Sequence, residues 1–154
     1  MIQPDHATHT SRTVHRDDRA QYLVVADETS LTQLRSELAL LPLCARGRVF
    51  IEVAAPEDEF VLDVPLRMTV TWLPRSTRTG RPGTATRCAP GEAVRRAVTA
   101  WTAEMLCDGP GSTTAILTGD YRAVAGIYEH LVEDVAMPVS SIATPSMFRL
   151  SGPR

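Results

Sequence analysis

Acidic, hydroxyl and arginine side chains directly follow three segments that the sequence predicts to be strands. The set comprises Asp27, Glu28, Thr29, Arg75, Gly119 and Asp120. Carboxylates and hydroxyls can contact a ribose or a phosphate, arginine suits bidentate contact with phosphate, and a glycine lets a ligand approach a helix N-terminus. Because parallel sheets bind ligands at the carboxyl ends of their strands, we expect these six residues to line one binding site.

Each member of this set also has a purely structural interpretation. Residues 27–29 can cap the helix that follows them, and Asp120 can be a simple N-cap whose charge would repel a phosphate. Arg75, Arg78 and Arg81 belong to an arginine-rich loop that can be solvated rather than bound to a ligand. Among these three, we expect Arg75 to be the strongest phosphate ligand, because it follows a strand directly.

Five apolar segments alternate with three segments of helical periodicity. The predicted strands are residues 22–26, 49–53, 68–72, 114–118 and 139–144, and the predicted helices are residues 31–41, 92–106 and 121–131. This alternation predicts an α/β domain with a mostly parallel sheet and helices on both faces. The helical spacing directs Met105 and Tyr121 toward the core. We assign residues 21–154 to this domain and residues 1–20 to a disordered arm or linker.

The composition is that of a globular domain, and it excludes several kinds of chemistry. The chain has 154 residues, 44% apolar and 22% charged, with a net charge of −2, so no nucleic-acid or anionic membrane partner is expected. All 16 basic residues are arginine and asparagine is absent, which excludes a Schiff base, a Walker lysine and a Cys-His-Asn triad. With neither a membrane-spanning apolar run nor a signal peptide, we expect a cytoplasmic protein.

Cysteine and histidine are too scattered to predict a metal site or a disulfide framework. The cysteines are Cys44, Cys88 and Cys107, and the histidines are His6, His9, His15 and His130. An odd number of widely spaced cysteines fits neither zinc coordination nor paired disulfides. We therefore expect reduced thiols, no metal and an exposed His130. No nucleophile motif is present, so no residue is assigned a catalytic role.

Several segments together carry a family resemblance. The sequence YLVVADETSL occupies residues 22–31, ARGRVFIEVA occupies residues 45–54, and VTWLPR occupies residues 70–75. Weaker similarity is found in residues 117–120, in the helical pattern of residues 124–132 and in the ending Met-Phe-Arg at residues 147–149. These segments resemble the C-terminal domain of siderophore-interacting proteins, the flavin-dependent ferric-siderophore reductases. The resemblance extends over nearly the whole chain.

The resemblance implies a three-layer α/β fold with a five-stranded sheet, like the nucleotide-binding domain of ferredoxin reductases. In the family, this domain delivers hydride from NADPH to a flavin held by a preceding β-barrel, and the flavin reduces the Fe(III) of a siderophore. The first predicted strand here begins at Tyr22, so we expect this chain to lack the barrel. The resemblance thus implies a possible NADPH module without FAD that works with a separate flavin protein or forms a homodimer. The choice between NADPH and NADH stays open.

The sequence departs from the family pattern at four places. Ala26 stands where the family has glycine, Pro74 where it has histidine, Asp120 where it has glutamate, and Met147-Phe148 where it has tyrosine and tryptophan. The methyl group of Ala26 would narrow the approach of a dinucleotide to the strand end. The alternative interpretation is therefore a non-catalytic interaction or regulatory module that has kept the fold and lost nucleotide binding.

Overall fold

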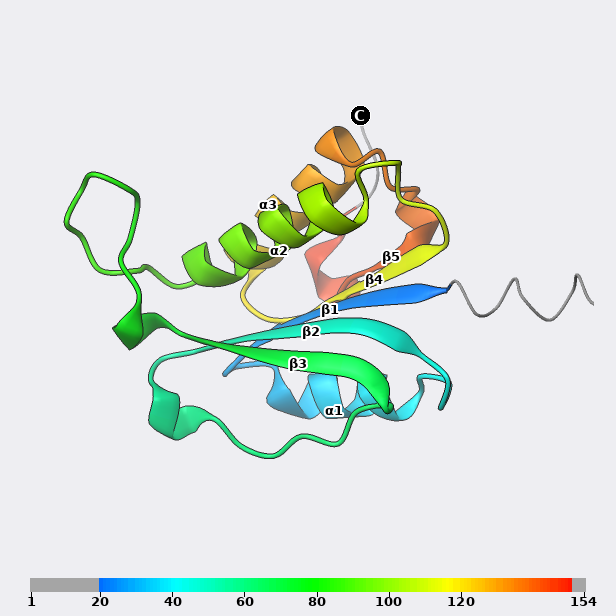
Figure 1. The fold of residues 1–154 in the computed structure, drawn as a ribbon, viewed down its shortest axis with the longest axis horizontal. Helices are drawn as coiled ribbons and strands as arrows, with labels where there is room; N and C mark the ends of the chain where they lie inside the picture. The colour runs from blue at the N-terminus through cyan, green and yellow to red at the C-terminus, as the bar shows by residue number, and fades with distance from the viewer. Residues whose placement is uncertain (1–19, 151–154) are drawn as a thin grey trace, which may run out of the picture.

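Five parallel strands form one sheet with helices on both faces in the computed structural model, which describes residues 20–150 (Figure 1). The strands are β1 (Gln21–Asp27), β2 (Arg46–Val53), β3 (Arg67–Pro74), β4 (Thr113–Leu117) and β5 (Ile142–Ala143), and the helices are α1 (Leu31–Ala39), α2 (Glu92–Met105) and α3 (Tyr121–Glu129). The expected α/β fold with a five-stranded parallel sheet is confirmed. Most of the predicted arm, with its three histidines, lies outside the described residues.

The strand order β3-β2-β1-β4-β5 places β1 at the centre of the sheet. The chain adds β2 and then β3 on one side of β1, and α2 carries it to the other side, where β4 and β5 follow. Because all these pairings are parallel, the carboxyl ends of β1 to β4 lie along one side of the sheet, here called the carboxyl edge. The strand order reverses between β1 and β4, which is where open α/β sheets bind ligands.

The apolar residues of β1 alternate between the two faces of the sheet and so anchor both helical layers. Leu23 and Val25 belong to the core cluster that includes α2 and α3, whereas Val24 and Ala26 belong to the cluster that includes α1. All four side chains are at most 2% exposed. A strand buried on both faces is typical of a parallel sheet and explains the unbroken apolar run in the sequence. Figure 1 shows α1 on one side of the sheet and α2 and α3 on the other.

The fifth strand is shorter than the sequence predicts. Only Ile142–Ala143 pairs with β4. The preceding residues, Val139–Ser141, form a short 3₁₀ turn in which the backbone N–H of Ser141 donates to the carbonyl of Pro138. The first half of the predicted strand at residues 139–144 is therefore a turn and not extended.

Three side chains differ in solvent exposure from what the sequence predicts. Met105 is 49% exposed and Tyr121 is 51% exposed, because they are the last residue of α2 and the first residue of α3. His130, expected to be exposed, has only 19% of its side chain exposed. Its ring nitrogens contact Thr102 Oγ1 at 2.9 Å and Asp134 Oδ2 at 2.7 Å, so it joins α2 to the short π-helical turn after α3.

The described part of the chain, residues 20–150, shows neither a membrane-spanning helix nor a metal site. No helix in this range is long and apolar enough to cross a membrane. No group of three His, Cys, Asp or Glu side chains in the same range is arranged as a metal site. Cys44 and Cys107 are exposed, Cys88 is buried, and all three are free thiols.

Candidate functional site

The six residues singled out from the sequence lie at the carboxyl edge, in two groups that make direct contacts. Asp27 and Thr29 follow β1, and Asp27 contacts the Gly119-Asp120 turn after β4. Glu28 also follows β1 and contacts Arg75 from the end of β3. The sheet therefore brings together side chains that are more than ninety residues apart in the sequence.

The carboxylate of Asp27 fills the turn between β4 and α3. Its Oδ2 accepts a hydrogen bond from the backbone N–H of Asp120 at 2.7 Å, and its Oδ1 accepts from the N–H and the hydroxyl of Thr29 at 2.9 and 2.6 Å. Gly119 has a φ of +118°, and a Cβ there would lie 2.7 Å from Asp27 Oδ2. Only glycine fits this close approach, so the missing side chain of Gly119 makes room for Asp27.

Residues 27–29 do not cap the helix that follows them, which corrects the capping interpretation. The N-cap of α1 is Ser30, and no side chain caps that helix. The N-cap of α3 is Asp120, whose Oδ2 accepts a hydrogen bond from the backbone N–H of Arg122 at 2.9 Å. Two carboxylates, those of Asp27 and Asp120, thus lie at the start of α3, and their negative charge opposes a phosphate at that position.

A third carboxylate, that of Glu52 near the end of β2, fills the N-terminus of α2. Glu52 is 1% exposed. Its Oε1 accepts a hydrogen bond from the backbone N–H of Gly91 at 2.6 Å, and its Oε2 accepts from the N–H of Val94 at 2.9 Å. These are N–H groups that a helix leaves without internal partners, so Glu52 caps α2 from within the sheet.

Arg75 is already paired inside the protein. Its Nη1 and Nη2 donate to the two carboxylate oxygens of Glu28 at 3.0 and 2.6 Å, and Nη1 also lies 3.2 Å from Glu52 Oε1. The hydrogen bond from Arg75 holds the pKa of Glu28 below its ordinary value. Glu28, and to a lesser extent Glu52, raises the pKa of Arg75. Two carboxylates therefore neutralise this guanidinium, whose side chain is only 16% exposed.

The other arginines of the loop after β3 lie outside this network. Figure 1 shows the loop projecting away from the sheet before it returns to α2. Arg78 and Arg81 are exposed on it. The base of the loop is held by Arg96 of α2, whose guanidinium donates to the carbonyls of Thr79 at 2.8 Å and Gly80 at 3.2 Å.

The structure places two of the departures from the family pattern, Ala26 and Phe148. The methyl group of Ala26 is 1% exposed and packs in the core cluster of α1, so it does not narrow the carboxyl edge. Phe148 packs edge-to-face on Tyr121, with 5.3 Å between the ring centroids. Because Tyr121 is the first residue of α3 and half exposed, an aromatic pair remains beside Asp120.

Sequence reasoning missed Glu52 as a site residue. The sequence did carry a signal, because Glu52 is the single charged residue inside the apolar run of residues 49–53. A charge buried in such a strand requires a partner. It also missed the contact between the hydroxyls of Ser30 and Thr118, which lie 3.0 Å apart and connect the loop after β1 to the end of β4. Neither hydroxyl carries a pattern that distinguishes it from other serines and threonines in the sequence.

Comparison with known proteins identifies the family. The family model described as siderophore-interacting protein matches residues 19–146. The chain belongs to the siderophore-interacting protein family. Uncharacterized proteins of Mycobacterium tuberculosis and Mycobacterium bovis are 40% identical to it over 57 residues, which are 37% of this chain and 20% of each of those proteins.

Solved structures of siderophore-interacting proteins share the fold. The protein SipS from Aeromonas hydrophila matches with a TM-score of 0.58 and 20% identity, over 80% of this chain and 43% of SipS. A siderophore utilization protein from T. fusca matches with a TM-score of 0.56 and 26% identity, over 80% of this chain and 42% of that protein. The chain thus spans less than half the length of these relatives.

Replacing Glu52 tests its role as the cap of α2. We expect Glu52→Ala to lower the free energy of unfolding by about 3–5 kcal/mol, because Arg75 and two helix N–H groups lose a buried partner. Urea denaturation followed by circular dichroism measures this change. Glu52→Gln, which keeps a carbonyl acceptor for one N–H group, should lose less and remain folded.

The exposed Glu57, on the connection after β2, provides the matched control. We expect Glu57→Ala to change the free energy of unfolding by less than about 0.5 kcal/mol. Equal effects of Glu52→Ala and Glu57→Ala would contradict the capping role of Glu52.

The lowered pKa of Glu28 predicts a pH dependence of stability. The Glu28 carboxylate takes up a proton less readily in the folded protein than in the unfolded chain. The stabilisation by ionised Glu28 is therefore complete above the ordinary glutamate pKa of about 4.3, and it is lost as the pH falls through the lower pKa of the folded protein. The pair is partly exposed to solvent. We therefore expect the wild-type protein to lose about 0.5–1 kcal/mol more than Glu28→Gln between pH 7 and pH 3.

Urea denaturation at the two pH values measures this difference, with the exposed Glu59→Gln as the control for a change of charge. A loss that is the same in wild-type and Glu28→Gln protein would show that the pair does not stabilise the fold.

Proposed function

We propose that this chain is a cytoplasmic NAD(P)H-binding domain of the siderophore-interacting protein type, formed by residues 21–154, that assists ferric-siderophore reduction with a separate flavin protein. Family membership supports the proposal. The observation that carries it is the convergence of Glu28, Thr29 and Arg75 at the carboxyl edge. This edge lies beside the reversal of strand order, where α/β sheets hold dinucleotides.

Glu28 is the residue best suited to hold the ribose of the nucleotide. Its side chain is 37% exposed, although Arg75 binds both of its oxygens. A carboxylate oxygen has more than one acceptor position, so Glu28 can accept a ribose hydroxyl while it remains paired. Carboxylates at this edge hold ribose hydroxyls in dinucleotide-binding folds. The adjacent Thr29 is exposed and offers a second polar contact.

Arg75 and Asp27 act as positioning residues in this proposal. Arg75 fixes both oxygens of Glu28 in a bidentate pair, so less side-chain freedom is lost when a ligand binds. Asp27 holds the Gly119-Asp120 turn against the end of β1. The bound nucleotide would supply a hydride donor, and the chain's own residues would bind and orient it. Because side chains do not accept hydride, the acceptor is the flavin of a partner.

The alternative is a non-catalytic interaction module, and two observations favour it. The carboxylates of Asp27, Asp120 and Glu52 fill the helix N-termini that often bind phosphate. A groove of about 550 Å³ lies between α1 and residues 61–65, and Leu43 and Val61 beside it are 91% and 95% exposed. Exposed apolar residues of this kind are typical of protein interfaces.

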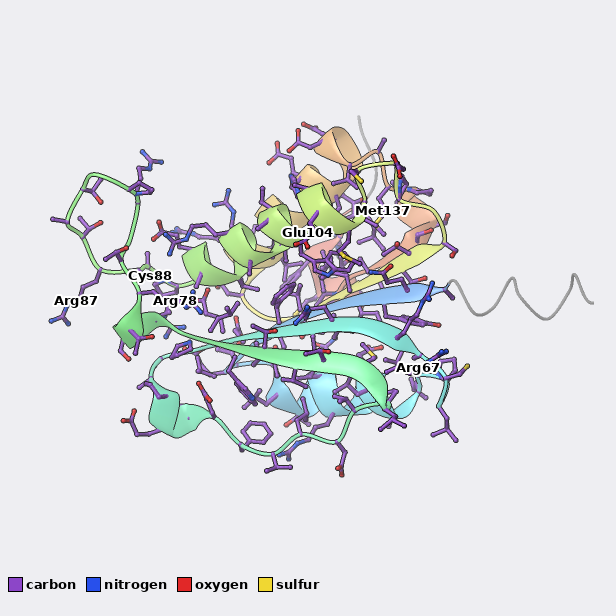
Figure 2. All side chains as sticks on the ribbon, in the orientation of Figure 1. Arg67, Arg78, Arg87, Cys88, Glu104 and Met137 are labelled. Carbon is purple, nitrogen blue, oxygen red and sulfur yellow. The ribbon has the colours of Figure 1, made fainter. Side chains whose placement is uncertain are left out.

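Calorimetric titration with NADPH and NADH separates the two functions. We expect micromolar binding to the wild-type protein and about tenfold weaker binding of both nucleotides to Glu28→Gln, because a charge-assisted hydrogen bond to the ribose is lost. The control is Glu104→Gln, the same change at an exposed carboxylate near the end of α2 (Figure 2), which should bind as the wild type does.

Two results would contradict the proposal in different ways. No binding of either nucleotide at millimolar concentration would reject the NAD(P)H-binding function and favour the interaction module. Tighter binding of NADPH alone to Glu28→Gln would show that the released Arg75 contacts the 2′-phosphate, so the assignment of Glu28 to the ribose would be wrong.

A further inference from the structure

A cleft next to the carboxyl edge is lined by arginine side chains from three elements. It has a volume of about 520 Å³ and lies between the loop after β3 and the first turns of α2 and α3. Arg81 of the loop, Arg95 of α2 and Arg122 of α3 belong to its lining. We call this the arginine cleft. Arg87 also borders it, but Figure 2 shows its side chain pointing away from the body of the protein.

Arginine outnumbers carboxylate in the lining of the arginine cleft. Within residues 20–150, the side chains of Arg81, Arg95 and Arg122 make no hydrogen bond or ion pair. Glu92 is the one carboxylate among the described lining residues, and its Oε2 accepts a hydrogen bond from the backbone N–H of Ala89 at 3.1 Å. Three guanidinium groups around one cleft repel one another until an anion binds among them.

The side chain of Arg95 in α2 lies against Gly126 of α3. Its Nε would lie 3.1 Å from a Cβ added to Gly126 of α3, and its guanidinium carbon would lie 3.4 Å away. A glycine inside a helix costs about 1 kcal/mol relative to alanine. At this position the missing side chain makes room for the guanidinium to pack against α3. The guanidinium of Arg95 therefore lies between α2 and α3, whereas Arg81 lies on the loop.

The arginine cleft is connected to the proposed nucleotide site through Gly91 and Glu52. Gly91 lines the cleft, and its backbone N–H donates to Glu52, which also contacts Arg75. At the carboxyl edge itself, Asp27, Asp120 and Glu52 occupy the helix N-termini, and Glu28 and Glu52 neutralise Arg75. A phosphate that arrives at this edge thus finds unpaired positive charge in the adjacent arginine cleft.

We propose that the arginine cleft, and not Arg75 or the Gly119-Asp120 turn, binds the phosphate groups of the dinucleotide. This inference rests on the proposed NAD(P)H-binding function and specifies where its phosphate is held. Arginine is suited to this role because its planar guanidinium donates two parallel hydrogen bonds to phosphate oxygens. The phosphate is either the diphosphate common to NADH and NADPH or the 2′-phosphate that only NADPH carries.

Calorimetric titration of Arg95→Gln and Arg122→Gln with inorganic pyrophosphate, NADPH and NADH tests the proposal. Both arginines are exposed, and neither side chain has a hydrogen-bond or ion-pair partner within residues 20–150, so these variants should fold normally. We expect each variant to bind pyrophosphate and NADPH about tenfold more weakly than the wild type does, through loss of charge-assisted hydrogen bonds. Arg35→Gln removes an exposed arginine from α1, on the opposite face of the sheet, and should leave all three affinities unchanged.

The two nucleotides identify the phosphate. An equal loss of affinity for NADH and NADPH would assign the cleft to the diphosphate, and a loss confined to NADPH would assign it to the 2′-phosphate. Either result supports the arginine cleft as the phosphate site.

The remaining outcomes separate the cleft from the proposed function. Unchanged NADPH binding in both variants would overturn the assignment of the arginine cleft as the phosphate site, but it would not contradict the NAD(P)H-binding function. Pyrophosphate binding that depends on Arg95 and Arg122, without any binding of NADPH or NADH, would keep the cleft as a phosphate site and reject the function. No binding of any of the three ligands to the wild type would overturn both.

Discussion

The buried carboxylate of Glu52 connects the elements that form the carboxyl edge. It caps α2 through Gly91 and Val94, and it contacts Arg75 at the end of β3. A carboxylate that is 1% exposed is tolerated in the interior only because each of its oxygens has a hydrogen-bond donor. This one side chain thus links the first turn of α2 to Arg75, which in turn holds Glu28.

This constraint determines where positive charge is available around the site. The carboxylates at the edge neutralise Arg75 and fill the first turns of α2 and α3. The guanidinium groups of Arg95 and Arg122 lie a short distance away and have no partner among residues 20–150. The protein thus separates a carboxylate group that can contact ribose from an arginine group that can contact phosphate. A dinucleotide carries both chemistries along its length.

The fold was predictable because it follows from local patterns, whereas the site was only partly so. The apolar run of β1 and the helical spacing of leucines in α1 gave the parallel sheet and its layers. Strand ends located Glu28, Arg75 and Asp120 at one edge. The pairing of Arg75 with Glu28, and the role of Glu52, depend on contacts between residues that are distant in sequence. The partners themselves follow from no spacing rule, and only the packing of the strand ends and of β2 against α2 brings them together.

A crystal structure of the protein with bound NADPH tests the central claim most directly. We predict phosphate oxygens against the guanidinium groups of Arg95 and Arg122, a ribose hydroxyl on Glu28, and an unchanged pair between Glu28 and Arg75. Glu52 should keep its hydrogen bonds to Gly91 and Val94. A phosphate bound in the Gly119-Asp120 turn, with the carboxylate of Asp27 displaced, would contradict the account.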